Sequence, residues 1–146
     1  MMATVIPLYR TPDARGDVVR ILLAWGCEGE RGRICQGLDS LGYDVCAVGT
    51  ADRALDLLTC GVWPIAIFDQ DLPDMPGLQV ASLLKFMAAS GRRDLDSVHT
   101  IVCGRCLNKA DEEATSTVER WLGKPVSPTD IIAAVADLIP PKGQVR

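Results

Sequence analysis

The sequence predicts an α/β protein: a doubly wound, five-stranded parallel sheet with helices on both faces. Short apolar runs alternate with amphipathic helical patterns along the chain, which is typical of βα units. Most of the runs are apolar throughout, as expected for strands that are buried on both faces. The length of 146 residues suits one domain.

Five stretches have the pattern of buried strands. The first, VVRILLAW, is interrupted only by Arg20, and the third, PIAIFD, ends in Asp69. The predicted strands cover residues 18–25, 43–48, 64–69, 98–103 and 120–122. In an open parallel sheet, ligands bind at the carboxyl ends of the strands. A site is therefore expected among Trp25–Gly26, Val48–Gly49, Asp69, Cys103 and Leu122–Lys124.

Five helical patterns follow the strands. The stretch GCEGERGR is interpreted as a flexible loop before the first helix, which Gly42 ends. Thr50 is the expected cap of the second helix, and Ser127 and Asp130 stand at capping-box distance before the last. The predicted helices cover residues 34–41, 51–60, 78–90, 109–119 and 128–138, with a polar loop over 91–97.

Charge and composition exclude several classes of protein. The net charge is −4 and no stripe of Lys and Arg is visible, which disfavours direct binding of nucleic acid. No run of eighteen apolar residues indicates a membrane span, and the N-terminus lacks the pattern of a signal peptide. We therefore expect a cytoplasmic protein, with a flexible N-terminal arm over 1–17, a domain over 18–139 and a C-terminal tail over 140–146.

The cysteines and the histidine do not suggest a metal site. Six cysteines lie mostly in apolar runs, and we interpret them as reduced thiols that pack as small hydrophobic side chains. Cys103 and Cys106 form a single C-x-x-C without a second pair, so we interpret them as unrelated thiols. His99 is the only histidine and is expected to be a strand residue.

Asp69 differs from the two aspartates that follow it. It closes an otherwise apolar strand, so its carboxylate is expected at the mouth of the sheet, partly removed from water. Asp71 and Asp74 lie among prolines and a glycine, and turn formation is the favoured interpretation for both. Lys124 follows the fifth strand at the same edge, where an ammonium group can neutralise a buried carboxylate or bind a phosphoryl oxygen.

The stretches IFDQDLPDMPG and WLGKP, in this βα alternation, resemble the receiver domain of two-component response regulators, which is flavodoxin-like. The resemblance covers residues 18–139. It implies that Asp69 accepts a phosphoryl group and that Lys124 contacts the phosphoryl oxygens. It also implies a cis peptide bond before Pro125.

The same resemblance gives expectations for three further positions. Trp121 stands at the position of the aromatic residue that swings inward on activation. Asp71 matches a position whose backbone carbonyl joins the shell of a Mg²⁺ ion, together with the Asp69 carboxylate. Cys103 stands at the usual Ser or Thr that contacts the phosphoryl group, and a thiol is only a weak donor.

The largest departure from the family concerns the metal. Trp25 and Gly26 occupy the positions of the acidic pair that follows the first strand. Mg²⁺ prefers several oxygen ligands, so its binding is expected to be weakened. Glu28 and Glu30 lie nearby and are candidate substitute ligands, as is the side chain of Asp71.

Two functions follow from the resemblance, and both remain open from the sequence. The first is a stand-alone receiver that takes a phosphoryl group on Asp69 from a histidine kinase or histidine phosphotransfer protein and signals to a downstream protein. The alternative is a pseudo-receiver that binds proteins independently of phosphorylation. Neither is an enzyme beyond self-phosphorylation and autodephosphorylation. A nucleotide binder is disfavoured because the G-x-x-G-x-x-G spacing matches no phosphate-loop fingerprint.

Overall fold

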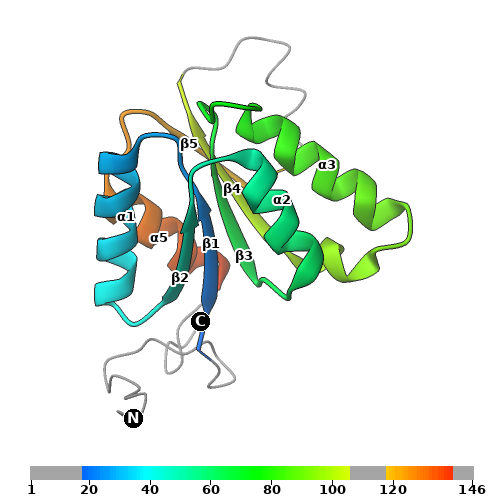
Figure 1. Cartoon of the computed structure of the whole chain (residues 1–146). Coiled ribbons are helices and arrows are strands. Elements are labelled where there is room, and N and C mark those ends of the chain that lie inside the picture. Colours follow the sequence, from blue (N-terminus) through cyan, green and yellow to red (C-terminus); the bar gives the residue numbers. More distant parts are fainter. Residues whose placement is uncertain (1–17, 106–117, 140–146) are drawn as a thin grey trace, which may run out of the picture.

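A five-stranded parallel sheet forms the centre of the molecule (Figure 1). The structure is a computed structural model that describes residues 18–105 and 118–139. The strand order is β2-β1-β3-β4-β5, and every neighbouring pair is parallel. The strands are β1 (Arg20–Ala24), β2 (Asp44–Val48), β3 (Ile65–Asp69), β4 (His99–Gly104) and β5 (Arg120–Gly123). The predicted fold class is confirmed.

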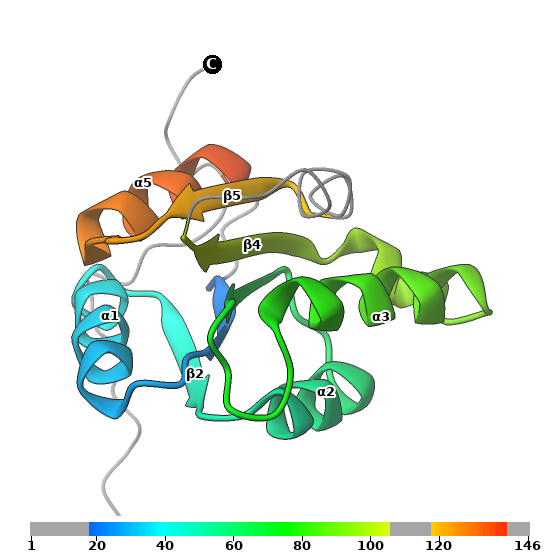
Figure 2. The same cartoon turned by 90° about the horizontal axis from the view of Figure 1, so that it is seen from above.

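Helices cover both faces of this sheet (Figures 1 and 2). One face carries α1 (Glu28–Ser40) and α5 (Pro128–Leu138), and the other carries α2 (Ala51–Cys60) and α3 (Gly77–Ala89). A short 3₁₀ helix, η1 (Arg93–Ser97), connects α3 to β4. The molecule thus has three layers, as expected for a doubly wound sheet.

Each face of the sheet has its own hydrophobic core. Along β1, Ile21 and Leu23 pack into the core beneath α1 and α5, whereas Leu22 and Ala24 pack beneath α2 and α3. Successive strand residues point to opposite faces, so a strand covered on both sides needs apolar residues at every position. This arrangement explains why the central runs of the sequence are continuously apolar.

The predicted caps set where two helices begin. Thr50 Oγ1 accepts a hydrogen bond from the backbone N–H of Arg53 at the start of α2. At α5, Ser127 and Asp130 form the reciprocal capping box, with distances of 3.2 and 3.1 Å. Gly42, just beyond α1, has a φ of 90°, a backbone conformation that glycine adopts at low cost.

The predicted loop before the first helix is wrong, because α1 begins at Glu28. Glu28 and Glu30 lie in its first turn, where negative charge interacts favourably with the helix dipole. This contribution and the packing of Ile34 and Leu38 in the core outweigh the low helix propensity of the glycines in that turn. The boundary therefore depends on tertiary contacts more than on local propensity.

Several other predictions have different outcomes. The loop expected over 91–97 contains η1, and His99 is a strand residue as predicted. The arm over 1–17, the tail over 140–146 and most of the helix expected over 109–119 lie outside the described residues. Within residues 18–105 and 118–139, no helix combines the length and the apolarity that crossing a membrane requires.

The interpretation of the cysteines as small hydrophobic residues that pack in the core is confirmed for three of them. Cys103 is buried, and the half-buried Cys35 and Cys46 pack against the two cores. It is wrong for Cys27 and Cys60, which are exposed. Cys106 lies outside the described residues.

Candidate functional site

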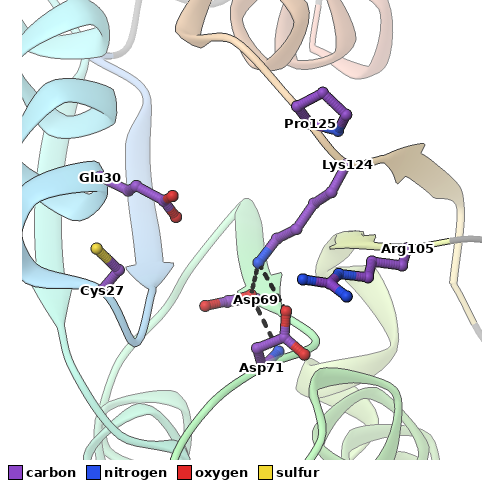
Figure 3. A pocket seen from close by; sticks show the side chains of 7 residues that line it. All are labelled: Cys27, Glu30, Asp69, Asp71, Arg105, Lys124 and Pro125. Atoms are coloured by element: carbon purple, nitrogen blue, oxygen red, sulfur yellow. Dashed lines mark hydrogen bonds and ion pairs between the residues drawn. The ribbon is translucent and has the colours of Figure 1, made fainter.

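A cavity of about 720 Å³ opens at the carboxyl edge of the sheet. Side chains from four separate segments line it: Cys27, Glu30, Asp69, Asp71, Arg105, Lys124 and Pro125 (Figure 3). Asp69 is the last residue of β3 and Lys124 follows β5. The structure thus places both predicted residues in one pocket, at the edge where the sequence placed the site.

The Asp69 carboxylate accepts a hydrogen bond from each of three donors. Its Oδ1 accepts from Lys124 Nζ at 2.5 Å and from the backbone N–H of Asp71 at 3.0 Å. Its Oδ2 accepts from the backbone N–H of Gly26, also at 3.0 Å. The residue is only 2% exposed, and a buried carboxylate requires such compensation.

Lys124 connects the two aspartates of the pocket (Figure 3). Its ammonium group donates to Asp69 Oδ1 and, at 3.0 Å, to Asp71 Oδ2. Burial alone lowers the pKa of Lys124, but the hydrogen bonds to the two carboxylates and their charges outweigh burial and raise it. The lysine is therefore a permanent cation at physiological pH.

Lys124 also lies over an aromatic ring. Its Nζ is 4.9 Å from the centroid of the Trp25 ring, within the range of a cation–π contact. The indole nitrogen is also bound, because Trp25 Nε1 donates to Glu30 Oε1 at 2.9 Å. Glu30, Trp25 and Lys124 thus form a connected series that ends on Asp69.

The main chain around Gly26 lies close to the pocket residues. A Cβ atom at Gly26 would be 2.8 Å from the carbonyl oxygen of Asp71 and 3.4 Å from Asp69 Oδ2. Only a residue without a side chain fits this approach unless the Asp71 loop moves. Arg31 closes the neighbouring part of the edge, since it donates to the carbonyl oxygen of Trp25 and lies over Gly49.

The loop after Asp69 is held by its own side chains. Asp74 accepts hydrogen bonds from the backbone N–H groups of Ala51 and Asp52, at 2.8 and 2.9 Å, so it caps α2 from a distant segment. The bond from Ala51 is the main cause of a lowered Asp74 pKa. Gln70 Oε1 accepts from the N–H of Leu78 at the start of α3. The interpretation of Asp74 as a turn residue therefore missed its long-range role.

No protein-family model and no curated protein matches the chain by sequence. Solved structures do match it in three dimensions. Chemotaxis response regulator CheY4 of Vibrio cholerae has a TM-score of 0.73 at 14% identity, covering 84% of this chain and 99% of that one. A CheY-like response regulator receiver domain protein from Methanospirillum hungatei has a TM-score of 0.70 at 21% identity, covering 83% and 93%.

A third match is the response regulator TrrA of Thermotoga maritima, solved in complex with Mg²⁺ and BeF, with a TM-score of 0.69 at 17% identity over 84% and 100% of the two chains. The chain has the receiver fold. At these identities the likeness establishes the fold alone, so the roles of individual residues rest on the geometry of this chain.

The receiver fold implies a divalent cation beside Asp69, and the residues of this chain do not fit one. The nearby carboxylates of Asp69 and Asp71 both bind Lys124, and Glu30 binds the Trp25 indole. Across 18–105 and 118–139, no three His, Cys, Asp or Glu side chains are placed to hold a metal ion together. Glu28, one of the candidate substitute ligands, is exposed and does not line the cavity. Lys124 offsets part of the charge of Asp69 and Asp71 instead.

Cys103 lies behind the pocket. It pairs with Asp69 in the sheet register, yet it is fully buried in the core beneath α1 and α5 and does not line the cavity. Burial, and secondarily the charge of Asp69, raises the pKa of its thiol to about 12, so the thiol is neutral. Cys103 was predicted to contact a phosphoryl group. This stays a prediction, and the cavity lining does not support it.

Trp121 lies on the other face of the sheet. It is half-buried and packs against the core beneath α2 and α3. A Cβ atom at Gly104 would be 2.8 and 2.9 Å from two atoms of the Trp121 ring and 2.8 Å from Gln70 Cβ. The absence of a side chain at Gly104 therefore makes room for the large indole. Movement of Trp121 on activation stays a prediction.

Three of the pocket residues were expected at this site from the sequence: Asp69, Asp71 and Lys124. The cis bond before Pro125 that the resemblance implied is present. Reasoning from sequence missed Cys27 and Arg105 as lining residues, although both follow the ends of strands at the same edge. It also identified Trp25 only as a lost ligand, because nothing local shows that its ring faces a lysine from the other end of the domain.

Proposed function

We propose that the chain is a two-component signalling protein that acts through protein–protein contact without phosphorylation of Asp69, with a receiver pocket that functions without a divalent cation; we call this the metal-independent mode. Its upstream partner is a histidine kinase or a histidine phosphotransfer protein, and its output is a protein target. The receiver fold supports the signalling role. The protein works in the cytoplasm and turns over no substrate of its own.

The observation that carries the metal-independent mode is the set of donors around Asp69. One ammonium group and two backbone N–H groups already bind its oxygens. The positions after β1 supply an indole and a main chain where the family has two carboxylates. The carboxylate is therefore stabilised within the fold, and binding to a partner does not require its modification.

A second candidate is the acceptance of a phosphoryl group on Asp69. It is favoured by the cavity of about 720 Å³ beside the carboxylate, which Lys124 and Arg105 also line. In this mode an Asp69 oxygen forms a bond to phosphorus while the bond from phosphorus to the donor histidine breaks, and the histidine nitrogen leaves with the electron pair. The cation that binds the transferred oxygens is Lys124.

Intact-mass measurement distinguishes the two modes. The purified full-length chain is incubated with acetyl phosphate, with and without Mg²⁺, beside the Asp69→Asn variant as a matched control. The metal-independent mode predicts no added phosphoryl mass on the wild type, or equal addition to both proteins. Addition to the wild type alone contradicts it and establishes the second candidate.

A test in the host addresses the signalling role itself. Replacement of the chromosomal copy by Asp69→Asn should leave the output of the pathway close to wild type, because the contact surface is retained. Deletion of the whole chain should abolish that output. Loss of output in the Asp69→Asn strain, with normal protein levels, contradicts the metal-independent mode.

A further inference from the structure

Trp25 is the most enclosed aromatic residue of the site and is fixed from several sides. It is 1% exposed. Its backbone N–H donates to the carbonyl oxygen of Val48, and its own carbonyl oxygen accepts from Arg31. The indole Nε1 donates to Glu30. The orientation of the ring is therefore determined before Lys124 is considered.

Lys124 has the opposite character. Its side chain is a flexible stem with a single strongly hydrated charge, and it reaches the pocket from the segment after β5 (Figure 3). Yet the side chain is only 17% exposed, with two carboxylates on one side and the Trp25 ring on another. A long, flexible side chain that is held in one buried position needs a surface that restricts it.

We propose that Trp25 is a positioning residue: its ring holds the Lys124 ammonium group on Asp69 and Asp71. The cation that binds these two carboxylates is then a side chain of the protein and not a metal ion from solution. This inference rests on the metal-independent mode proposed above. It goes beyond that mode because it assigns a function to the residue that replaces a carboxylate of the family.

The charge of the pocket explains why a ring suits this position. Three carboxylates and two cations line the cavity: Glu30, Asp69 and Asp71 against Arg105 and Lys124. A carboxylate at position 25 would add a further negative charge and demand a cation from solution. An indole attracts the ammonium group through the negative face of its π system and adds no net charge. The indole therefore does not add to the negative charge that Lys124 and Arg105 offset in the cavity.

The inference is testable on Lys124 directly. The chain has four lysines, so a spectrum of protein labelled with ¹³C at the lysine ε carbon is simple, and the Lys124 signal is assigned by its loss in Lys124→Met. Protons above an aromatic face are shielded. The ε protons of Lys124 should therefore resonate upfield of those of the exposed Lys85 in the wild type.

Three substitutions separate positioning from general structural support. Trp25→Leu should remove the upfield shift and lower the measured pKa of Lys124, because the ammonium group loses its ring. Trp25→Phe should retain most of the upfield shift and most of the pKa of Lys124, since it keeps an aromatic face, although it loses the hydrogen bond to Glu30. Trp63→Phe is the control: this buried indole donates to Leu57 and lies under Arg20, and its loss should leave Lys124 unchanged.

The result that overturns the inference is a Lys124 signal that coincides with that of Lys85 in the wild type, or one that Trp25→Leu leaves in place. If Trp25→Leu does not fold, the wild-type shift and Trp25→Phe still decide, because loss of the shift in folded Trp25→Phe also overturns it. Phosphoryl transfer is not measured in any arm, so these outcomes are distinct from those that test the proposed function.

Discussion

The carboxyl edge of the sheet has two halves that differ in chemistry. The half formed by β3 and β5 is ionic, because Asp69 and Asp71 bind Lys124. In the half formed by β1, which we call the uncharged half, the groups that contact Asp69 and Lys124 carry no charge: the Gly26 main chain and the Trp25 ring. Glu30 binds the nitrogen of that indole. Both halves nevertheless contact the same carboxylate, since the backbone N–H of Gly26 donates to the second oxygen of Asp69.

The difference shows that two separate kinds of contact stabilise the buried Asp69 carboxylate. In the ionic half a lysine offsets its charge, and in the uncharged half a backbone N–H binds its second oxygen. The two halves make separate contributions, so each can be removed alone. The experiments below test the two halves, the flank of the ionic half and the loop after Asp69, in order of decreasing expected effect.

Removal of the lysine breaks the ionic half. Lys124→Met leaves the buried Asp69 carboxylate without a cation, and we expect a loss of about 3–5 kcal/mol in the free energy of unfolding. Urea denaturation at neutral pH measures it. Lys85→Met is the matched control, because its ion pair with Asp96 is exposed and 4.0 Å long, and it should change stability by less than about 0.5 kcal/mol.

The same contact predicts a dependence on pH in the wild type. The folded-state pKa of Lys124 is raised above its ordinary value of 10.5, so the stabilisation is complete below that value and is lost as the pH rises through the folded pKa. The advantage of the wild type over Lys124→Met should therefore shrink only in strongly alkaline solution. A loss that begins near neutral pH contradicts this assignment.

A side chain at Gly26 disturbs the uncharged half. The Cβ atom of Gly26→Ala would approach the carbonyl oxygen of Asp71 to 2.8 Å, so the loop must move, at an expected cost of about 1–3 kcal/mol. Gly32→Ala in α1 is the control, since its Cβ would have no atom within 4 Å; it should be neutral or stabilise by up to about 1 kcal/mol. Equal effects of the two substitutions would refute the close approach.

The flank of the ionic half is tested at Gly104. In Gly104→Ala the new methyl group collides with the Trp121 ring, which is half-buried and can shift outward, so we expect a cost of about 1–2 kcal/mol. In protein labelled with 5-fluorotryptophan, the Trp121 signal should move while the Trp63 signal stays. Gly123→Ala on β5 has open space at its Cβ and should move neither signal.

The smallest effect concerns the loop that carries both aspartates. Asp74→Asn weakens the cap on α2 and should cost about 1 kcal/mol at neutral pH. The folded-state pKa of Asp74 lies below 3.8, so this stabilisation is present above that value and disappears as the pH falls through the folded pKa. Wild type and variant should therefore become equally stable in strong acid, as urea denaturation across pH can show.

The features predicted from sequence share one property: a short stretch of residues specifies each of them. The apolar run that ends at Asp69, the Ser127 capping box and the position of Lys124 after a strand need only local pattern and the rule for parallel sheets. The fold class and the pairing of Asp69 with Lys124 follow from these, and the structure confirms both.

The features that escaped prediction depend on partners far along the chain. The start of α1 at Glu28 depends on core contacts of Ile34, which outweigh two glycines. Asp74 has the sequence context of a turn residue, but its hydrogen bonds go to Ala51 and Asp52. Trp25 and Lys124 come together only through the arrangement of the strands in the sheet. The sequence shows a tryptophan at position 25, but it does not show that its ring contacts Lys124.

The loop over residues 70–78 has a further consequence for design. Its outer part is held by bonds to residues outside the cavity lining, from Asp74 to α2 and from Gln70 to α3. These bonds do not involve the side chains of Cys27 and Arg105, which line the cavity. Cys27 and Arg105 are therefore suitable positions for grafting a new binding specificity, because their exchange leaves these bonds in place.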